Sequence, residues 1–404
     1  MFLNSFSFLA FFAALAIAYY AVPHRFRWPL LLVASLYFYG TFSPSYVVLL
    51  LAVTLVAYWG GRGIEASDGT RERRALLTVS AAAVVGALLA FKYYDFFATS
   101  LDAALATAGL GGSTPLFPRL GLVLAVGLSF YTFSCVSYLV DVYARRLPAE
   151  RHFGHFALYV SFFPKLLAGP IERAEPFLSQ IRRPVRFSAP GVTLGLQVML
   201  WGLFKKVVIA DHLASFVDAA YAQPTFSSSA DLVLATYFFA FQLYCDFSGY
   251  SDMAIGASKI LGIDLMENFR RPYLSTSVSD FWAKRWHISL ARWFRDYVYI
   301  PMGGSRVSRI RQYGNVLAVF LVSGLWHGAN WTFVVWGGVN GLYHVLSLMT
   351  RRARARLAEA IAVPAPVKTV LSVVVTFHLI LVTWVFFRAE SLSDAYTILG
   401  RAAG

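Results

Sequence analysis

The chain has 404 residues, of which 58% are hydrophobic, 17% aromatic and 14% charged, and its net charge is +14. A soluble domain cannot bury so much apolar surface and still cover itself with polar groups. This composition therefore excludes a soluble protein and predicts a polytopic protein of the lipid bilayer. The Lys and Arg residues lie mainly between apolar runs, as the positive-inside rule requires, and we expect no nucleic-acid partner because no nucleic-acid-binding motif is present.

The apolar runs indicate helices, because they are long, contain Gly and Pro, and lack the alternation of an outer-membrane barrel. A span needs about 20 apolar residues, and we predict an all-α polytopic bundle with about 10–11 membrane segments. The first run has no basic region or cleavage site, so we expect it to be retained as a span. The predicted spans are 6–22, 28–40, 45–60, 75–92, 120–143, 191–210, 231–256, 314–326, 330–349 and 367–387.

The apolar run 153–170 differs from these, because it contains Pro164, Lys165, Gly169 and Pro170. A continuous spanning helix tolerates such residues poorly, since proline removes a backbone hydrogen bond and a charge is costly in lipid. We therefore predict a re-entrant or broken helix here.

Loop charge predicts the orientation of the spans, because Lys and Arg are concentrated at the cytoplasmic face. The loops expected there are 62–74, 145–151, 270–311 and 351–356. Loops 95–118 and 211–230 are nearly free of Lys and Arg and are expected outside, together with the N-terminus.

Charged side chains also occur within apolar runs, where they are costly and are usually paired or functional. Asp246 and Asp252 fit a structural polar network, a proton relay or a substrate contact. Lys205 and Lys206 fit either snorkelling to the interface or an ion pair with an intramembrane carboxylate.

The segment 279–304 carries aromatic residues at helical spacing beside a basic cluster. This pattern predicts an amphipathic helix that lies in the membrane interface, with His287 within it. The aromatic residues are Trp282, Trp286, Trp293 and Tyr297, and the basic ones are Lys284, Arg285, Arg292 and Arg295. The wider basic patch 284–311 is either a docking site for an anionic donor or a product of the positive-inside bias alone.

His327 lies between two apolar runs, so its imidazole is expected below the bilayer surface. Desolvation there favours the neutral ring, which suits a general base, although a structural core histidine fits the same pattern. Gly324 and Gly328 permit a helix break or the close approach of a ligand, and Asn330 is placed to orient a substrate or the imidazole.

Several stretches, taken together and in this order, resemble the membrane-bound O-acyltransferase (MBOAT) family and within it the bacterial alginate O-acetylation (AlgI) branch. The resemblance spans essentially the whole chain. The stretches are FFPKLLAGPIERAEPFLSQI (162–181), GLFKKVVIAD (202–211), QLYCDFSGYSDMAIG (242–256), NFRRPYLSTSVSDFWAKRWHISLARWFRDYVYIPMGG (268–304), SGLWHGANWTF (323–333) and WVFFRAES (384–391).

The resemblance implies that His327, in the WHGANW motif, is the catalytic residue and that His287, in the RWHISL motif, is a second residue needed for activity. It implies a multi-helix membrane body pierced by a tunnel, in the bacterial inner membrane. A cytoplasmic acetyl thioester, either acetyl-CoA or an acyl carrier protein, would donate the group. Periplasmic accessory acetyltransferase proteins would pass it to an exopolysaccharide such as alginate.

The candidate catalytic residues are therefore His327, as general base or acetyl relay, and His287, which would hold or polarise the thioester. We expect no bound cofactor and no metal, because no cluster of His, Cys or carboxylates has ligand spacing. The candidate substrate-binding residues are Asn330, Trp326, Trp286, Asp246, Asp252, Arg292 and Arg295.

We predict a single transmembrane domain over 1–404, with N-terminal spans in 1–150, the catalytic core in 151–350 and a C-terminal span in 351–404. Relatives in this branch usually continue beyond the WVFFRAES motif, so a truncated chain or a fragment is expected. Two alternatives stay open: transfer of D-alanyl or another acyl group to a cell-wall polymer or a protein by the same fold, and a polysaccharide flippase or transporter.

Overall fold

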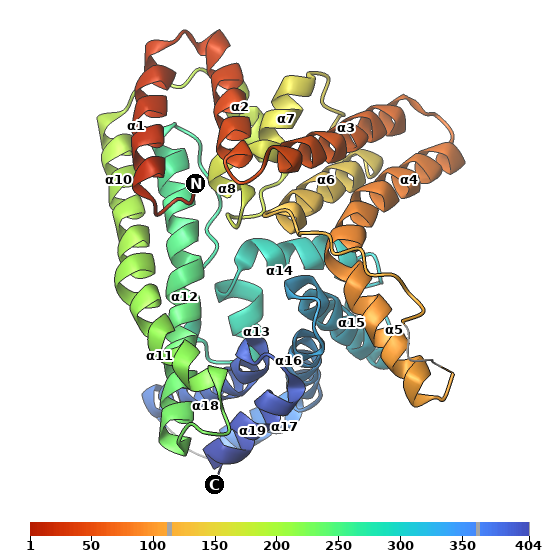
Figure 1. Cartoon of the computed structure of the whole chain (residues 1–404), viewed down its shortest axis with the longest axis vertical. Coiled ribbons are helices and arrows are strands. Elements are labelled where there is room, and N and C mark those ends of the chain that lie inside the picture. Colours follow the sequence, from red (N-terminus) through yellow and green to blue (C-terminus); the bar gives the residue numbers. More distant parts are fainter. Residues whose placement is uncertain (111–114, 361–363, 404) are drawn as a thin grey trace. The chain divides into compact units, whose positions relative to one another are not determined.

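A computed structural model describes residues 1–110, 115–360 and 364–403 (Figure 1), and within them every regular element is a helix. The prediction of an all-α fold is confirmed. The chain forms two compact units, Met1–Met199 with Met253–Leu265, and Leu200–Asp252 with Met266–Gly404. Whether they act as one domain, as the sequence predicts, stays a prediction.

The first unit begins with helices that match the predicted N-terminal spans. These are α1 (Phe6–Ala21), α2 (His24–Gly40), α3 (Pro44–Ala66) and α4 (Thr70–Leu88), with α6 (Leu128–Tyr143) packed against α3 and α4. The predicted span 120–143 becomes helical only after Gly127, whose φ is +80°. A Cβ atom at this glycine would lie 2.6 Å from the backbone oxygen of Leu166, so no larger residue fits there.

Two segments predicted as external loops are largely helical. The π turn η1 (Leu89–Tyr93) joins α4 to α5 (Tyr94–Thr107), and the π turn η2 (Lys205–Ala210) joins α10 (Ala189–Phe204) to α11 (Asp211–Ala222). The prediction of loops at 95–118 and 211–230 was wrong over these helices. Scarcity of Lys and Arg reports on the side of the membrane and carries no information about secondary structure.

The run 153–170 is a broken helix, as predicted. It forms α7 (Phe153–Ser161) and the single turn α8 (Phe163–Leu166), followed by α9 (Ala174–Arg182). Lys165 is 4% exposed, and its ammonium lies 4.3 Å from the centroid of the Tyr159 ring and 5.3 Å from that of Phe177. Aromatic faces can stabilise a buried cation in this way, and the segment serves as core of the first unit.

Helices α10 and α12 (Ser229–Ile260) touch backbone to backbone at two glycine pairs, one in each unit. A Cβ atom on Gly256 would lie 2.5 Å from the oxygen of Gly195, and a Cβ atom on Gly249 would lie 2.7 Å from the oxygen of Gly202. Small residues at these positions allow helices to approach closely in a membrane, where apolar burial gives little driving force.

The second unit is built around the hairpin of α15 (Arg309–His327) and α16 (Trp331–Met349). A Cβ atom on Gly324 would lie 3.2 Å from the Cα atom of Gly337, so the two helices cross at these glycines. Helix α18 (Ala365–Arg388) packs on α16 and contributes Trp384 to a buried cluster with Trp286 and Trp336. The remaining helices are α17 (Arg351–Ala360) and α19 (Leu392–Ala403).

The segment 279–304 is a chain of short helical pieces, so the prediction of one interfacial helix was wrong. Its pieces are α13 (Val278–Asp280), η4 (Phe281–Arg285), α14 (Ile288–Phe294) and η5 (Arg295–Tyr299). The chain is extended at Trp286, and His287 has a φ of +45°. Trp286 and Trp293 are 3% and 6% exposed, so these aromatic residues pack inside the protein and do not form a membrane-facing stripe.

Four helical stretches among the described residues are long and apolar enough to span a membrane. They are Pro44–Ala66, Thr70–Thr107, Ala189–Ala222 and Ala365–Arg388. The chain is thus a multi-pass membrane protein, while the predicted total of spans, their orientation and the tunnel stay predictions.

Candidate active site

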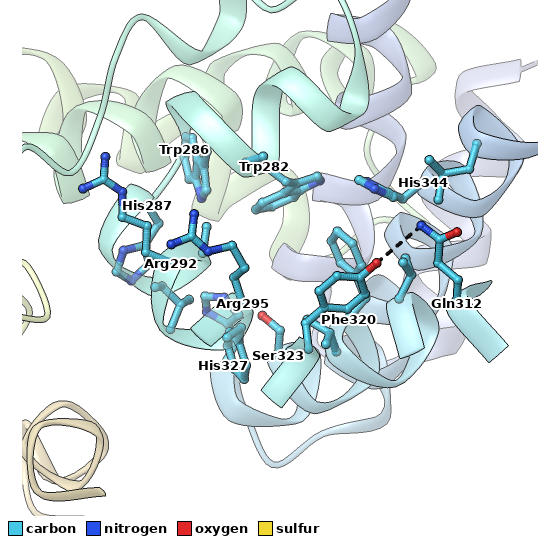
Figure 2. Close-up of a pocket in the computed structure, with 18 residues that line it drawn as sticks. Trp282, Trp286, His287, Arg292, Arg295, Gln312, Phe320, Ser323, His327 and His344 are labelled. Atoms are coloured by element: carbon cyan, nitrogen blue, oxygen red, sulfur yellow. Dashed lines mark hydrogen bonds between the residues drawn. The ribbon is translucent and has the colours of Figure 1, made fainter. Parts of the chain in front are cut away.

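The second unit contains a cavity of about 310 Å³ whose wall carries both predicted catalytic histidines. His287 comes from the break before α14, and His327 is the last residue of α15. Trp286, Arg292 and Arg295, three of the predicted substrate-binding residues, line the same cavity (Figure 2). The fold thus brings together five of the candidate residues from two separate stretches of sequence.

The backbone around His287 is fixed by two hydrogen bonds to the segment that precedes η3 (Pro272–Leu274). The N–H of Ile288 donates to the oxygen of Asn268, and the N–H of Arg270 donates to the oxygen of Arg285, each at 2.9 Å. These bonds hold the chain on both sides of the left-handed His287. Strained backbone at such a point is often found at functional sites.

The His287 side chain is 2% exposed and is surrounded by polar and aromatic partners. Its Nδ1 atom lies 2.9 Å from Oδ1 of Asn268, and the Phe247 ring meets the imidazole edge to face at 4.7 Å. Burial, and then the proximity of His327, lower the pKa of His287 well below its usual value, because both disfavour the charged imidazolium. His287 is therefore neutral at physiological pH.

His327 packs edge to face against three aromatic rings. The centroid distances are 4.8 Å to Trp326, 5.0 Å to Trp336 and 5.2 Å to Phe387. Trp326 also contacts His287, at 6.2 Å between ring centroids. This tryptophan is 8% exposed, packs against both imidazoles and is not among the residues that line the cavity, so its predicted contact with substrate stays a prediction.

Asn330 supports the corner between α15 and α16. Its Oδ1 atom accepts from the N–H of Thr332 at 3.1 Å and so caps α16, while its Nδ2 atom donates to the oxygen of Glu390 at 2.9 Å. Both ends of the side chain therefore have partners in the fold. The structure gives Asn330 a role in holding the corner after His327, and its predicted contact with substrate stays a prediction.

Arg292 and Arg295 give one wall of the cavity a positive charge. They lie at neighbouring turns of α14 and η5, and both are exposed. Arg295 pairs with Asp296 at 2.8 Å. An anionic group at the mouth of the cavity would meet this pair of guanidinium groups.

Asp246 and Asp252 belong to a separate ion-pair network between α12 and η2. Lys205 Nζ lies 2.7 Å from Asp252 Oδ2, and Lys206 Nζ lies 2.6 Å from Asp246 Oδ1 and 2.7 Å from Asp211 Oδ1. Of the two explanations for the lysines, the structure supports the ion pairs. Among the described residues, the cavity that holds the histidines does not include these two carboxylates, and their predicted contact with substrate stays a prediction.

The cavity also contains polar residues that the sequence did not single out. Ser323 lies four residues before His327, on the same face of α15, and Figure 2 shows its hydroxyl directed into the cavity. This spacing was a usable signal. His344 also lines the cavity, and its Nδ1 atom lies 3.3 Å from Ser279 Oγ. It was hidden in an apolar run.

A metal site is not found among the described residues, where no three His, Cys, Asp or Glu side chains are grouped to hold an ion.

Comparison with known proteins identifies the family. The sequence profile of the membrane-bound O-acyltransferase family, MBOAT, matches residues 82–388, a range that includes both histidines and the whole cavity. The chain belongs to this family. It is thus an acyltransferase, as the sequence predicts.

The chain is similar to several named acyltransferases. It is 39% identical over 399 residues to the probable alginate O-acetylase AlgI of Azotobacter vinelandii, covering 97% of this chain and 75% of that protein. It is 35% identical over 400 residues to the peptidoglycan O-acetyltransferase of Helicobacter pylori (93% and 73%). The teichoic acid D-alanyltransferase of Bacillus subtilis is 26% identical over 288 residues (68% and 71%).

Proposed function

We propose that this acyltransferase moves an acetyl group from a cytoplasmic thioester to hydroxyls of an extracytoplasmic exopolysaccharide of the alginate type. The observation that carries the proposal is the cavity in which His287 and His327 meet beside Arg292 and Arg295. The chain is 39% identical to a probable alginate O-acetylase in an alignment that covers 97% of the chain. This similarity favours acetyl as the group transferred. The bacterial inner membrane is the location that such a reaction requires.

The reaction needs one base. The oxygen of an acceptor hydroxyl bonds to the thioester carbonyl carbon, and the carbon–sulfur bond breaks. His327 takes the hydroxyl proton as general base and returns it to the departing thiolate, so the products are an acetyl ester and a free thiol. No further reactant is needed for the balance.

The donor is acetyl-CoA or an acetylated carrier protein, both of which present a phosphate next to a pantetheine arm. Arg292 and Arg295 bind this phosphate, and the apolar wall of the cavity takes the arm. The acceptor hydroxyl belongs to the polymer or to a periplasmic accessory acetyltransferase that passes the acetyl group on. The protein itself holds no resident cofactor in this scheme.

The test uses proteoliposomes that contain the parent protein or His327→Ala, supplied with a radiolabelled acetyl thioester. An alginate oligosaccharide, a peptidoglycan fragment and a D-alanyl carrier with lipoteichoic acid form three separate arms. The parent is expected to label the oligosaccharide, with or without added accessory protein. His327→Ala should reduce the rate by about 10²-fold or more, the usual contribution of a general base.

The outcome of each arm decides between the alternatives. Labelling of peptidoglycan alone, or transfer of D-alanine alone, would replace the alginate-type acceptor by that polymer. Movement of polymer across the bilayer without ester formation would indicate a transporter. A correctly inserted His327→Ala variant with the parent rate would remove His327 from the mechanism.

A further inference from the structure

Asn268 lies directly behind His287 and is 1% exposed. Its Oδ1 atom is 2.9 Å from His287 Nδ1, 2.9 Å from Ser289 Oγ and 3.3 Å from the backbone nitrogen of Ser289. We propose that Asn268 is a positioning residue, which holds His287 in the tautomer protonated at Nδ1 and so makes Nε2 its proton-accepting atom. This inference rests on the proposed function, in which the cavity where His287 and His327 meet is the site of acetyl transfer.

The orientation of the Asn268 amide follows from its partners. A backbone N–H can only donate, so the amide atom that faces the N–H of Ser289 must be the oxygen. The Ser289 hydroxyl donates to the same oxygen. Because an amide oxygen cannot donate, the hydrogen bond between Asn268 Oδ1 and His287 Nδ1 requires a proton on Nδ1.

The other side of the amide is also fixed. Asn268 Nδ2 donates to Ser251 Oγ at 3.1 Å, and Ser251 is 1% exposed on α12. Meanwhile, the backbone oxygen of Asn268 accepts from Ile288 at 2.9 Å. Side chain and backbone of Asn268 thus bind the His287 ring and the start of α14 at Ile288 and Ser289. A buried amide with this many partners has one orientation, which it imposes on the imidazole.

The tautomer decides which chemistry His287 can perform. A neutral imidazole with its proton on Nδ1 presents a lone pair at Nε2, so it accepts a proton or a hydrogen bond there and donates none. His287 therefore cannot polarise the thioester carbonyl by donating from Nε2 while neutral. At the cavity, Nε2 of His287 therefore accepts a hydrogen bond, while His327 remains the base that takes the hydroxyl proton. This replaces the polarising role that the sequence analysis expected of His287.

The first test measures the protonation of His287 without any substrate. Diethyl pyrocarbonate modifies neutral imidazole, and trypsin releases residues 286–292, WHISLAR, with His287 as the single histidine. Mass spectrometry of this peptide across pH gives the midpoint of its titration in the parent and in Asn268→Asp. The carboxylate keeps the accepting oxygen and adds a negative charge, so the midpoint should rise by about one pH unit or more.

The second test separates positioning from folding. Asn268→Leu removes the accepting oxygen at similar volume. It should lower kcat by about 10- to 100-fold, part of what positioned acid–base catalysis contributes, with the donor KM unchanged. Ser251→Ala releases the far side of the amide and should lower kcat by a smaller factor. Ser258→Ala is its matched control, because Ser258 is buried on the same helix and donates to its own backbone at Ala254.

The two readouts separate the inference from the proposed function. If the parent transfers no acetyl group, the proposed function fails, yet a raised midpoint in Asn268→Asp still supports the positioning role. If the parent is active, an unchanged midpoint in a folded Asn268→Asp overturns the positioning role and leaves the proposed function intact. Equal activity of Asn268→Leu and parent also overturns it.

Discussion

At the scale of single residues, the buried state of His287 has a consequence for the pH dependence of the enzyme. Burial and His327 lower its pKa, so the neutral ring persists as the pH falls below about 6.5, where a free histidine would gain a proton. We therefore expect protonation of His287 to cause no acidic limb of kcat/KM at or above about pH 6.5.

This prediction is checked by initial rates of acetyl transfer across the pH range. His212→Gln serves as the control, because His212 is exposed on α11. This substitution should leave the pH profile of kcat/KM unchanged. Titration of His287 itself, followed on the tryptic peptide 286–292, with a midpoint at or above the pH of a free histidine would contradict a neutral, buried His287.

Arg292 and Arg295 give a second prediction, because they line the cavity and are exposed to solvent. Changing both to Gln should raise the donor KM by about tenfold, roughly 1.4 kcal/mol of binding, and leave kcat nearly unchanged. A higher KM with an unchanged kcat indicates the loss of an interaction that stabilises the bound donor and the transition state equally. Added salt should also raise the donor KM of the parent, since it screens the attraction between the arginines and the anionic donor.

The matched control removes the same charge elsewhere. Arg71 and Arg74 are exposed at the same spacing on α4, in the first unit. Changing both to Gln should leave the donor KM at the parent value. If both double variants raise the donor KM equally, the overall charge of the protein explains the effect. If neither raises it, the cavity arginines do not bind the donor, and the positive-inside bias alone explains their presence.

At the scale of helices, the α15–α16 hairpin depends on glycines at the crossing. A Cβ atom on Gly337 would overlap the backbone oxygen of Phe320, whereas one on the adjacent Gly338 would make an ordinary contact of 3.7 Å with Leu321. We expect Gly337→Ala to lose about 1–3 kcal/mol of unfolding free energy through overpacking. Gly338→Ala should keep the parent stability or gain up to about 1 kcal/mol from helix propensity.

The comparison is made by thermal unfolding of the two variants in the same detergent or lipid. Gly337→Ala should also lower activity, because His327 ends the helix that the substitution displaces. A Gly337→Ala protein that melts at the parent temperature would show that the helices can separate without cost.

At the scale of the whole molecule, loop charge predicts sidedness. Cysteines are introduced singly at Asp68, Arg352, Gly109 and Phe226 after Cys135 and Cys245 are replaced. We expect an impermeant maleimide to label Gly109→Cys and Phe226→Cys in intact cells and to reach Asp68→Cys and Arg352→Cys only after the membrane is opened. Labelling of Arg352→Cys from outside would overturn the orientation.

The sequence by itself determined the class of the protein, most helix positions and the two histidines that line the cavity. Hydropathy is a local property, so the helices at 6–22, 45–60 and 367–387 could be read directly. The motifs around His287 and His327 are also local, because each is one short stretch of sequence. The ion pairs of Lys205 and Lys206 stayed open, since their partners lie on another helix.

Only the tertiary structure decided how these residues are used. The spacing of Trp282 and Trp286 suits a surface helix, but the hydrogen bonds of Asn268 to the 287–289 backbone and side chains break that helix. The aromatic residues therefore turn into the core, and the break places His287 on the wall of the cavity that His327 lines. Asn268 carries no signal of its own in the sequence, because its role exists only through contacts with residues distant in the chain.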